Sequence, residues 1–133
     1  MANALYDFGR NEFLLGNVDW KNDDIKVALV DDTDYTKNLA ADQFLSDVGA
    51  AARVATSTAL TGKTASAGTA YAADVTLPSV SGDTAEALVV YKDTTDPATS
   101  PLLVYIDDAT GLAVTPNGGD ITITWDAAGI FKL

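Results

Sequence analysis

The feature that most limits the fold of this chain is a pair of short segments that are apolar on both faces. They span residues 85–91 and 102–106, and a turn-rich stretch separates them. A strand has this continuously apolar pattern when both of its faces are covered by other parts of the protein. We therefore predict two central strands of a sheet that is packed on both sides.

Other segments alternate between apolar and polar residues, which indicates strands with one buried face. These predicted strands span residues 25–30, 52–60, 71–77 and 121–125. Gly, Pro, Asp and small polar residues mark loops or turns at 31–35, 61–69, 93–101, 107–111 and 116–120. Residues 38–47 predict a short helix or an irregular segment, and the apolar tail 130–133 ends the chain. Short strands separated by such turns are typical of an antiparallel β-sandwich.

Residues 3–16 predict an N-terminal helix that packs alongside the sandwich. Apolar side chains at helical spacing form a broad arc, which Glu12 interrupts, and Gly16-Asn17 provides a stop. The predicted fold is mainly β, with a single domain over residues 1–133 and the sandwich over about 24–133. A chain of 133 residues has the usual length for one domain.

The charge of the chain excludes several partners. It has 19 acidic and 8 basic residues, for a net charge of -11, and all the acidic residues except Glu12 and Glu86 are Asp. Such a charge repels phosphates and anionic lipid surfaces, so we expect neither nucleic acid nor membrane as a partner. The N-terminal segment lacks the pattern of a signal peptide, and no apolar run approaches the length of a membrane span. We expect synthesis in a cytosol.

The sequence contains no pattern that identifies an enzyme or a cofactor site. Cysteine and histidine are both absent, which removes the thiol nucleophile, the commonest general base and the commonest zinc ligands. Acidic pairs are too abundant for any one of them to indicate glycosidase chemistry. The segment 61–64 (TGKT) resembles the end of a phosphate-binding loop, but Ser57 stands where the upstream glycine belongs and a strand is predicted to follow. We predict no catalytic residue and no cofactor.

The acidic segment Asp31-Asp32-Thr33-Asp34 is the best candidate for a calcium site, because calcium prefers several hard oxygen ligands. It lacks the spacing of an EF-hand, so we interpret it as a solvated turn at a strand end and predict no metal ligand. Asp107-Asp108 has the same ambiguity. Trp20 and the tyrosines could also line a carbohydrate platform. Trp125 alternates with two isoleucines and is predicted to be in the core.

Several segments of the chain resemble a family of small virion structural proteins encoded by tailed phages. They are ANALYDFGR at 2–10, DW at 19–20, YKDT at 91–94, SPL at 100–102, YID at 105–107, PNGGD at 116–120 and IFKL at 130–133. The similar segments are distributed from end to end, and they are turns and strand ends without catalytic content. The resemblance implies a component of the virion that is not an enzyme.

A compact acidic sandwich suits the outside of a capsid, so we expect a decoration or cement protein that binds the major capsid protein or another virion protein, as a homo-oligomer. Two alternatives stay open: a tail or neck component (tube, baseplate or fibre base), and a carbohydrate-binding module for host attachment. Lys and Asp residues at 26, 92 and 93 weigh against the long uncharged edge strands of a tail tube. The terminal segments either complete the core or supply contacts with the shell or with sister subunits. The candidate interface residues are Leu5, Phe8, Phe13, Trp20, Ile130, Phe131 and Leu133.

Overall fold

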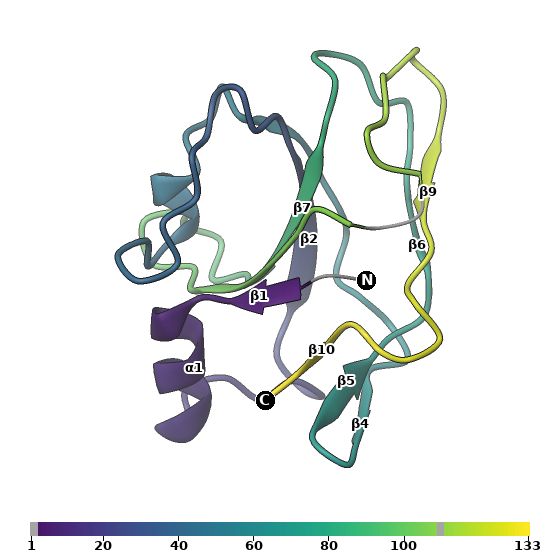
Figure 1. Cartoon of the computed structure of the whole chain (residues 1–133). Coiled ribbons are helices and arrows are strands. Elements are labelled where there is room, and N and C mark those ends of the chain that lie inside the picture. The colour runs from purple at the N-terminus through teal and green to yellow at the C-terminus, as the bar shows by residue number, and fades with distance from the viewer. Residues whose placement is uncertain (1–2, 109–110) are drawn as a thin grey trace.

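The two continuously apolar segments form neighbouring strands at the centre of the main sheet. The structure is a computed structural model that describes residues 3–108 and 111–133. The main sheet consists of β1 (Asn3–Leu5), β2 (Ile25–Val30), β3 (Arg53–Thr56), β7 (Ala87–Lys92) and β8 (Leu102–Ile106). It is antiparallel, in the order β1-β8-β7-β2-β3, and every residue of β8 is buried (Figure 1). The prediction of central strands covered on both faces is confirmed.

Two small sheets cover one face of the main sheet. They are formed by β4 (Thr64–Ser66), β5 (Thr69–Tyr71), β6 (Val75–Leu77), β9 (Ile121–Ile123) and β10 (Phe131–Lys132), in the orders β10-β5-β4 and β6-β9. Ile25, Val27 and Leu29 point from β2 into the core on this side. The packing of antiparallel sheets against each other confirms the predicted mainly β, sandwich-like architecture.

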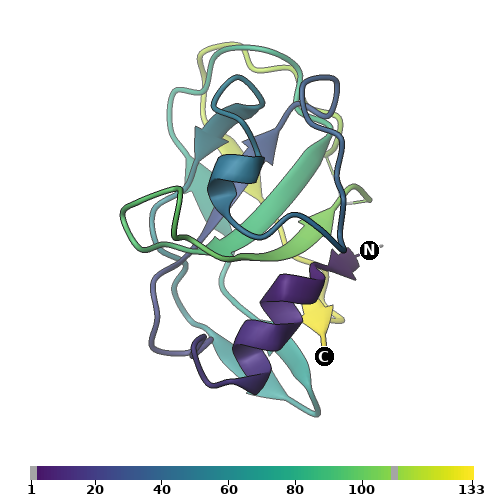
Figure 2. The same ribbon diagram turned by 90° about the vertical axis from the view of Figure 1, so that its left-hand side faces the viewer.

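The opposite face of the main sheet is covered by the chain between β2 and β3. This segment contains the 3-10 helix η1 (Leu45–Asp47), which lies in front of the sheet in Figure 2. Ala28 and Val30 alternate with the first set of β2 side chains and point into this second core. The sheet thus has a hydrophobic core on each side, as the period of two along a strand requires.

The N-terminal helix is shorter than predicted. Residues 3–5 form β1, which pairs with β8 along its edge, and α1 (Asp7–Leu14) begins only after Tyr6. The prediction of a helix from residue 3 was wrong, because pairing with the main sheet outweighs the local helical pattern. α1 then packs beside β8, as expected for a helix alongside the sandwich.

The predicted strand 71–77 is also corrected, because the chain passes from one small sheet to the other within it. β5 ends at Tyr71 and β6 begins at Val75. The segment 61–69, predicted as a loop, contains β4 and the turn of the β4–β5 hairpin, where Ala67 and Gly68 both have positive φ. The last strand predicted, 121–125, ends at Ile123 and is followed by β10.

Two further points concern single stretches of the chain. The middle of the turn predicted at 107–111, residues 109–110, lies outside the described residues. Among the described residues, no helix combines the length and the apolar character needed to cross a membrane.

Candidate functional site

Four of the predicted interface residues are buried within the chain. Leu5, Trp20, Ile130 and Phe131 all belong to the core beneath the small sheets. The indole N–H of Trp20 donates to the carbonyl oxygens of Thr64 at 3.1 Å and Tyr71 at 3.2 Å. Trp20 therefore links the loop between α1 and β2 to the β4–β5 hairpin. Trp20, a candidate for an exposed contact, is instead 8% exposed, and its ring and its donor are both satisfied internally.

The two phenylalanines of α1 are half-buried and pack against other parts of the same chain. Phe8 meets Phe44 edge to face, with ring centroids 5.0 Å apart. Phe13 lies 5.7 Å from Phe131, and Phe131 in turn contacts Trp20 at 5.2 Å. These rings attach α1 to the sandwich and leave only part of their surface for another molecule.

Leu133 is the one predicted interface residue that is mostly exposed, and Leu14 and Leu15 at the end of α1 are exposed as well. The exposed fractions are 86% for Leu14, 65% for Leu15 and 61% for Leu133. Leu14 and Leu133 line the same shallow groove together with Phe13 and Arg10. We call these five residues the contact end. Large apolar side chains grouped on a surface are typical of a protein–protein contact site.

Sequence reasoning missed Leu14 and Leu15 as contact residues. The sequence does contain a signal for them: Phe13, Leu14 and Leu15 are consecutive, and three successive residues of a helix cannot all face one core. Once α1 is fixed by Phe13 on its inner side, the two leucines must point elsewhere. Their position depends on where the helix begins and ends. The prediction of a helix over residues 3–16 placed both ends wrongly.

Two basic residues lie at the contact end of this strongly acidic protein. Arg10 lies one turn before Leu14, and Lys132 precedes Leu133; both are exposed. Among the described residues, the ion pairs instead join Lys26 to Asp93 at 2.7 Å and Lys92 to Asp23 at 3.3 Å. Arg10 and Lys132 are therefore available to an acidic partner.

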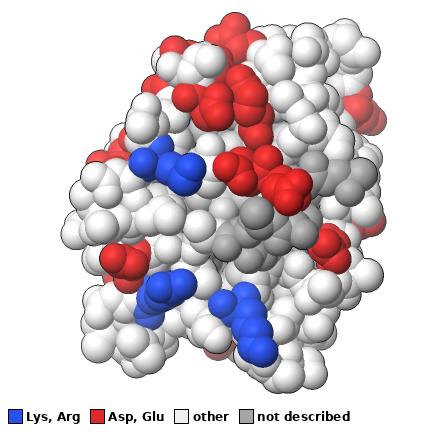
Figure 3. Space-filling model, viewed as in Figure 1, with Lys and Arg blue, Asp and Glu red and all other residues white. Residues whose placement is uncertain are grey.

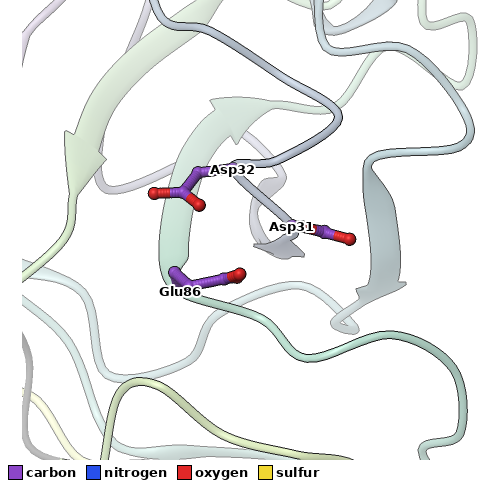
Figure 4. A group of neighbouring side chains, drawn as sticks. All are labelled: Asp31, Asp32 and Glu86. Carbon is purple, nitrogen blue, oxygen red and sulfur yellow. The ribbon is translucent and has the colours of Figure 1, made fainter.

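A second candidate site is a cluster of carboxyl groups at the end of β2. Asp31 and Asp32 follow β2, Glu86 precedes β7, and their oxygens lie within 4.8 Å of one another. Figure 4 shows the side chains of Asp31 and Asp32 pointing to opposite sides of the segment that follows β2, with Glu86 below them. Asp31 also forms a group of the same dimensions with Asp34 and Asp83. The structure therefore brings the predicted acidic turn together with two acidic residues from a distant part of the sequence.

The pKa values of Asp31 and Glu86 in this cluster are shifted in opposite directions. Hydrogen bonds from the Thr33 hydroxyl at 2.6 Å and from its backbone N–H at 2.9 Å lower the pKa of Asp31. Burial raises the pKa of Glu86, and repulsion from Asp31 and Asp32 adds to the effect. One oxygen of Glu86, Oε2, is buried without a hydrogen-bond partner. The negative charge is thus stabilised on Asp31 and destabilised on Glu86.

Oxygen ligands of this kind are those that calcium prefers, but the bonds between Asp31 and Thr33 also form an ordinary turn after a strand. Acidic side chains gather at surfaces without any bound ion. The carboxyl cluster by itself therefore indicates no particular ligand.

Comparison with known proteins adds no assignment at this point. No protein-family model matches the chain, and no curated protein matches it. The function must therefore be inferred from the surfaces just described.

The segment that resembles a phosphate-binding loop is built differently from one. Lys63 donates to the backbone carbonyl of Asp23, and Thr64 begins the strand β4 where a phosphate-binding loop would begin a helix. Trp125, expected in the core, is buried, and its indole N–H donates to the carbonyl of Ala73 at 3.1 Å. Both features are therefore parts of the scaffold.

Proposed function

We propose that this chain is a structural protein of a tailed-phage virion, and specifically a decoration or cement protein that binds the outer capsid shell and stabilises it through protein–protein contacts. The contact end carries the proposal. Three large apolar side chains remain exposed there, at 61% or more, while the other large apolar side chains among the described residues are buried or half-buried. A protein that acts through contacts needs such a surface.

Two further observations support the virion assignment. The main sheet is packed on both faces, which gives the rigid domain that a shell component requires. The similarity of seven segments to small tailed-phage virion proteins supports the same assignment. The net charge of -11 keeps such a protein away from the DNA packed inside a capsid.

The edge strands of the sheets are shorter than the alternative of a tail-tube subunit requires. A tail-tube subunit extends its sheets between neighbours and needs long free edges. Here the edge strand β3 has four residues and the edge strand β4 has three. Lys26 and Lys92 lie on the central strands β2 and β7, and Asp93 directly follows β7, so the predicted argument from charged edges was misplaced.

The copy number in purified particles tests the proposal. The chain and the major capsid protein are quantified by mass spectrometry in virions of the phage that encodes the chain. A decoration protein is expected in numbers comparable to the major capsid protein, because it occupies repeated sites on the shell. A handful of copies per particle, or none, would contradict the proposal.

Deletion of this chain from the particle tests whether it stabilises the capsid. Particles that lack the chain are expected to release their DNA at lower temperature or lower salt than complete particles. Adding the purified chain back should restore stability and place new density on the outside of the shell in electron micrographs. Density on the tail would support the alternative.

A further inference from the structure

We propose that the partner of the contact end is a second copy of this chain, bound head to tail, with Leu14 of one copy entering an apolar hollow of the next. The inference rests on the proposed function and deepens it by naming the partner. It assigns the two sides of one interface to different parts of the same molecule. Its elements are the exposed leucine, the hollow and the charges around each.

The apolar hollow lies where the small sheet β6-β9 meets the main sheet. Its volume is about 130 Å³, and its lining is almost entirely aliphatic: Leu29, Leu88, Leu112, Val114, Ile121 and Ile123. Leu29 and Leu88 are buried and form the floor, whereas Leu112 and Ile121 are half-buried at the margin. Apolar cavities of about 150 Å³ bind a molecule the size of benzene. The hollow can therefore receive one leucine side chain.

Leu14 has the position and shape to fill such a hollow. It is the last residue of α1 and is 86% exposed. In both ribbon views α1 lies at the lower end of the molecule, whereas β9 lies towards the upper end (Figures 1 and 2). The two surfaces are therefore far apart on one copy and can meet only between copies.

The charges around the two surfaces are complementary. Exposed Arg10 lies beside Leu14. At the hollow, exposed Asp120 directly precedes Ile121, and Val114 exchanges two backbone hydrogen bonds with Ala85, the neighbour of Glu86. Figure 3 shows acidic side chains gathered mainly over the upper half of one face; basic side chains lie near its lower edge and also beside the upper acidic group. Opposite charges on the two ends favour a head-to-tail encounter.

The same charges disfavour a symmetric contact in which two contact ends face each other. Arg10 and Lys132 of both copies would then meet across one interface, and like charges in contact oppose binding. A head-to-tail contact has no such conflict. Repeated around a symmetry axis of a shell, it closes into a ring, in which each copy contributes one leucine and one hollow.

A disulfide trap tests the contact, because the chain contains no cysteine of its own. Leu14→Cys is introduced in one preparation and Thr122→Cys in another; Thr122 is exposed and lines the hollow. The two full-length variants are mixed and mildly oxidised. The control replaces Thr122→Cys by Gly49→Cys, a position with open space around it. We expect the mixed disulfide between residues 14 and 122 to form at least tenfold faster than the control product.

Two results of the trap would overturn the inference. One is a mixed product that forms no faster than the Gly49→Cys control. The other is rapid formation of a disulfide between two Leu14→Cys copies, which would indicate a symmetric contact. Because the trap uses the purified chain, its failure leaves the copy number in particles unaffected. The two proposals can therefore fail separately.

Sedimentation of the purified chain gives an independent readout. Leu14→Asp is expected to weaken self-association at least tenfold, because a carboxylate cannot enter the hollow. Gly49→Asp makes the same change of charge at a site away from both surfaces and is expected to self-associate like the original chain. Equal self-association of the two variants would contradict the inference.

Discussion

Gly9 shows how closely α1 approaches the main sheet. A Cβ atom at this position would lie 2.5 Å from the carbonyl oxygen of Leu102 and 2.9 Å from the Cα of Leu103. Both are backbone atoms of β8, so they cannot turn aside as a flexible side chain could. The helix therefore contains glycine at its closest approach to the sheet, although glycine is a poor helix former.

We expect Gly9→Ala to lower the free energy of unfolding by about 2 kcal/mol, which is typical of overpacking in a closely packed site. Urea denaturation, monitored by circular dichroism, measures the change in the free energy of unfolding. Gly49→Ala is the matched control: no atom lies within 4 Å of its added Cβ, and we expect a change within about 0.5 kcal/mol. Equal stability of the two variants would show that α1 can move away from β8 without cost.

Glu86 connects the carboxyl cluster to the pH dependence of stability. Burial and the two neighbouring aspartates raise its pKa in the folded chain. The folded state therefore binds this proton more tightly than the unfolded state does. The contribution of Glu86 to stability is thus most favourable at low pH, and it falls as the pH rises through the range in which the unfolded and then the folded carboxyl group ionises.

Glu86→Gln imitates the protonated carboxyl group, and its amide can donate a hydrogen bond to Asp31. We expect the variant to melt a few degrees higher than the original chain at pH 7. The difference should disappear below about pH 4, where Glu86 is protonated in the unfolded chain as well. Differential scanning calorimetry over this pH range measures both effects.

The matched control is Glu12→Gln, at the only other glutamate of the sequence. Glu12 lies on α1, and the side-chain amide of Asn17 donates to it at 2.6 Å. A glutamine oxygen can still accept this bond, so we expect little change in melting temperature at either pH. A decrease in stability of Glu86→Gln at pH 7 would be evidence that the ionised Glu86 has a favourable partner.

At the scale of elements, three side chains hold the long β2–β3 connection on its face of the sheet. The hydroxyl groups of Tyr6 and Tyr35 lie 2.8 Å apart, and Tyr35 donates to the carboxylate of Asp42 at 2.6 Å. Burial raises the pKa of both tyrosines, so both hydroxyl groups stay protonated at any physiological pH. The connection thus has a polar attachment inside an otherwise apolar core.

We expect Tyr35→Phe to destabilise the protein by about 1–3 kcal/mol, because it leaves a buried hydroxyl and a carboxylate without their partner. Hydrogen exchange should accelerate in residues 31–48 more than in β9. Tyr71→Phe, in the small sheet on the opposite face, should leave exchange in that connection unchanged. Uniform acceleration over the whole chain in Tyr35→Phe would argue against a local attachment.

The elements that the sequence predicted best are those whose pattern is set by the main sheet. β2 was predicted over its observed range, and β7 and β8 were recognised by apolar residues on both faces. Residues 3–5 and 71–77 were misjudged, because sheet pairing between distant segments decides them and local periodicity does not contain it. The exposed leucines of the contact end were missed for a related reason: their exposure depends on what α1 packs against.

At the scale of the whole molecule, the two cores share one sheet. β2, β7 and β8 contribute side chains to both of them. Loss of either core exposes a face of the same strands, so neither half can unfold and leave the other intact.

We therefore expect a single cooperative unfolding transition. Near-ultraviolet circular dichroism, which reports on the packed aromatic rings, and far-ultraviolet circular dichroism, which reports on the strands, should give the same midpoint in urea. Two separate midpoints would show that one face can detach from the sheet.

The position of Leu133 has a practical consequence for anyone who engineers this protein. Because Leu133 belongs to the contact end, a purification tag or fusion joined to it would sit on the surface that we propose joins one copy to the next. The segment after η1 offers a better attachment point, since Gly49 is exposed and has open space around it. A peptide inserted there would be presented to solvent on every copy, which makes this segment the natural place for displaying a foreign epitope.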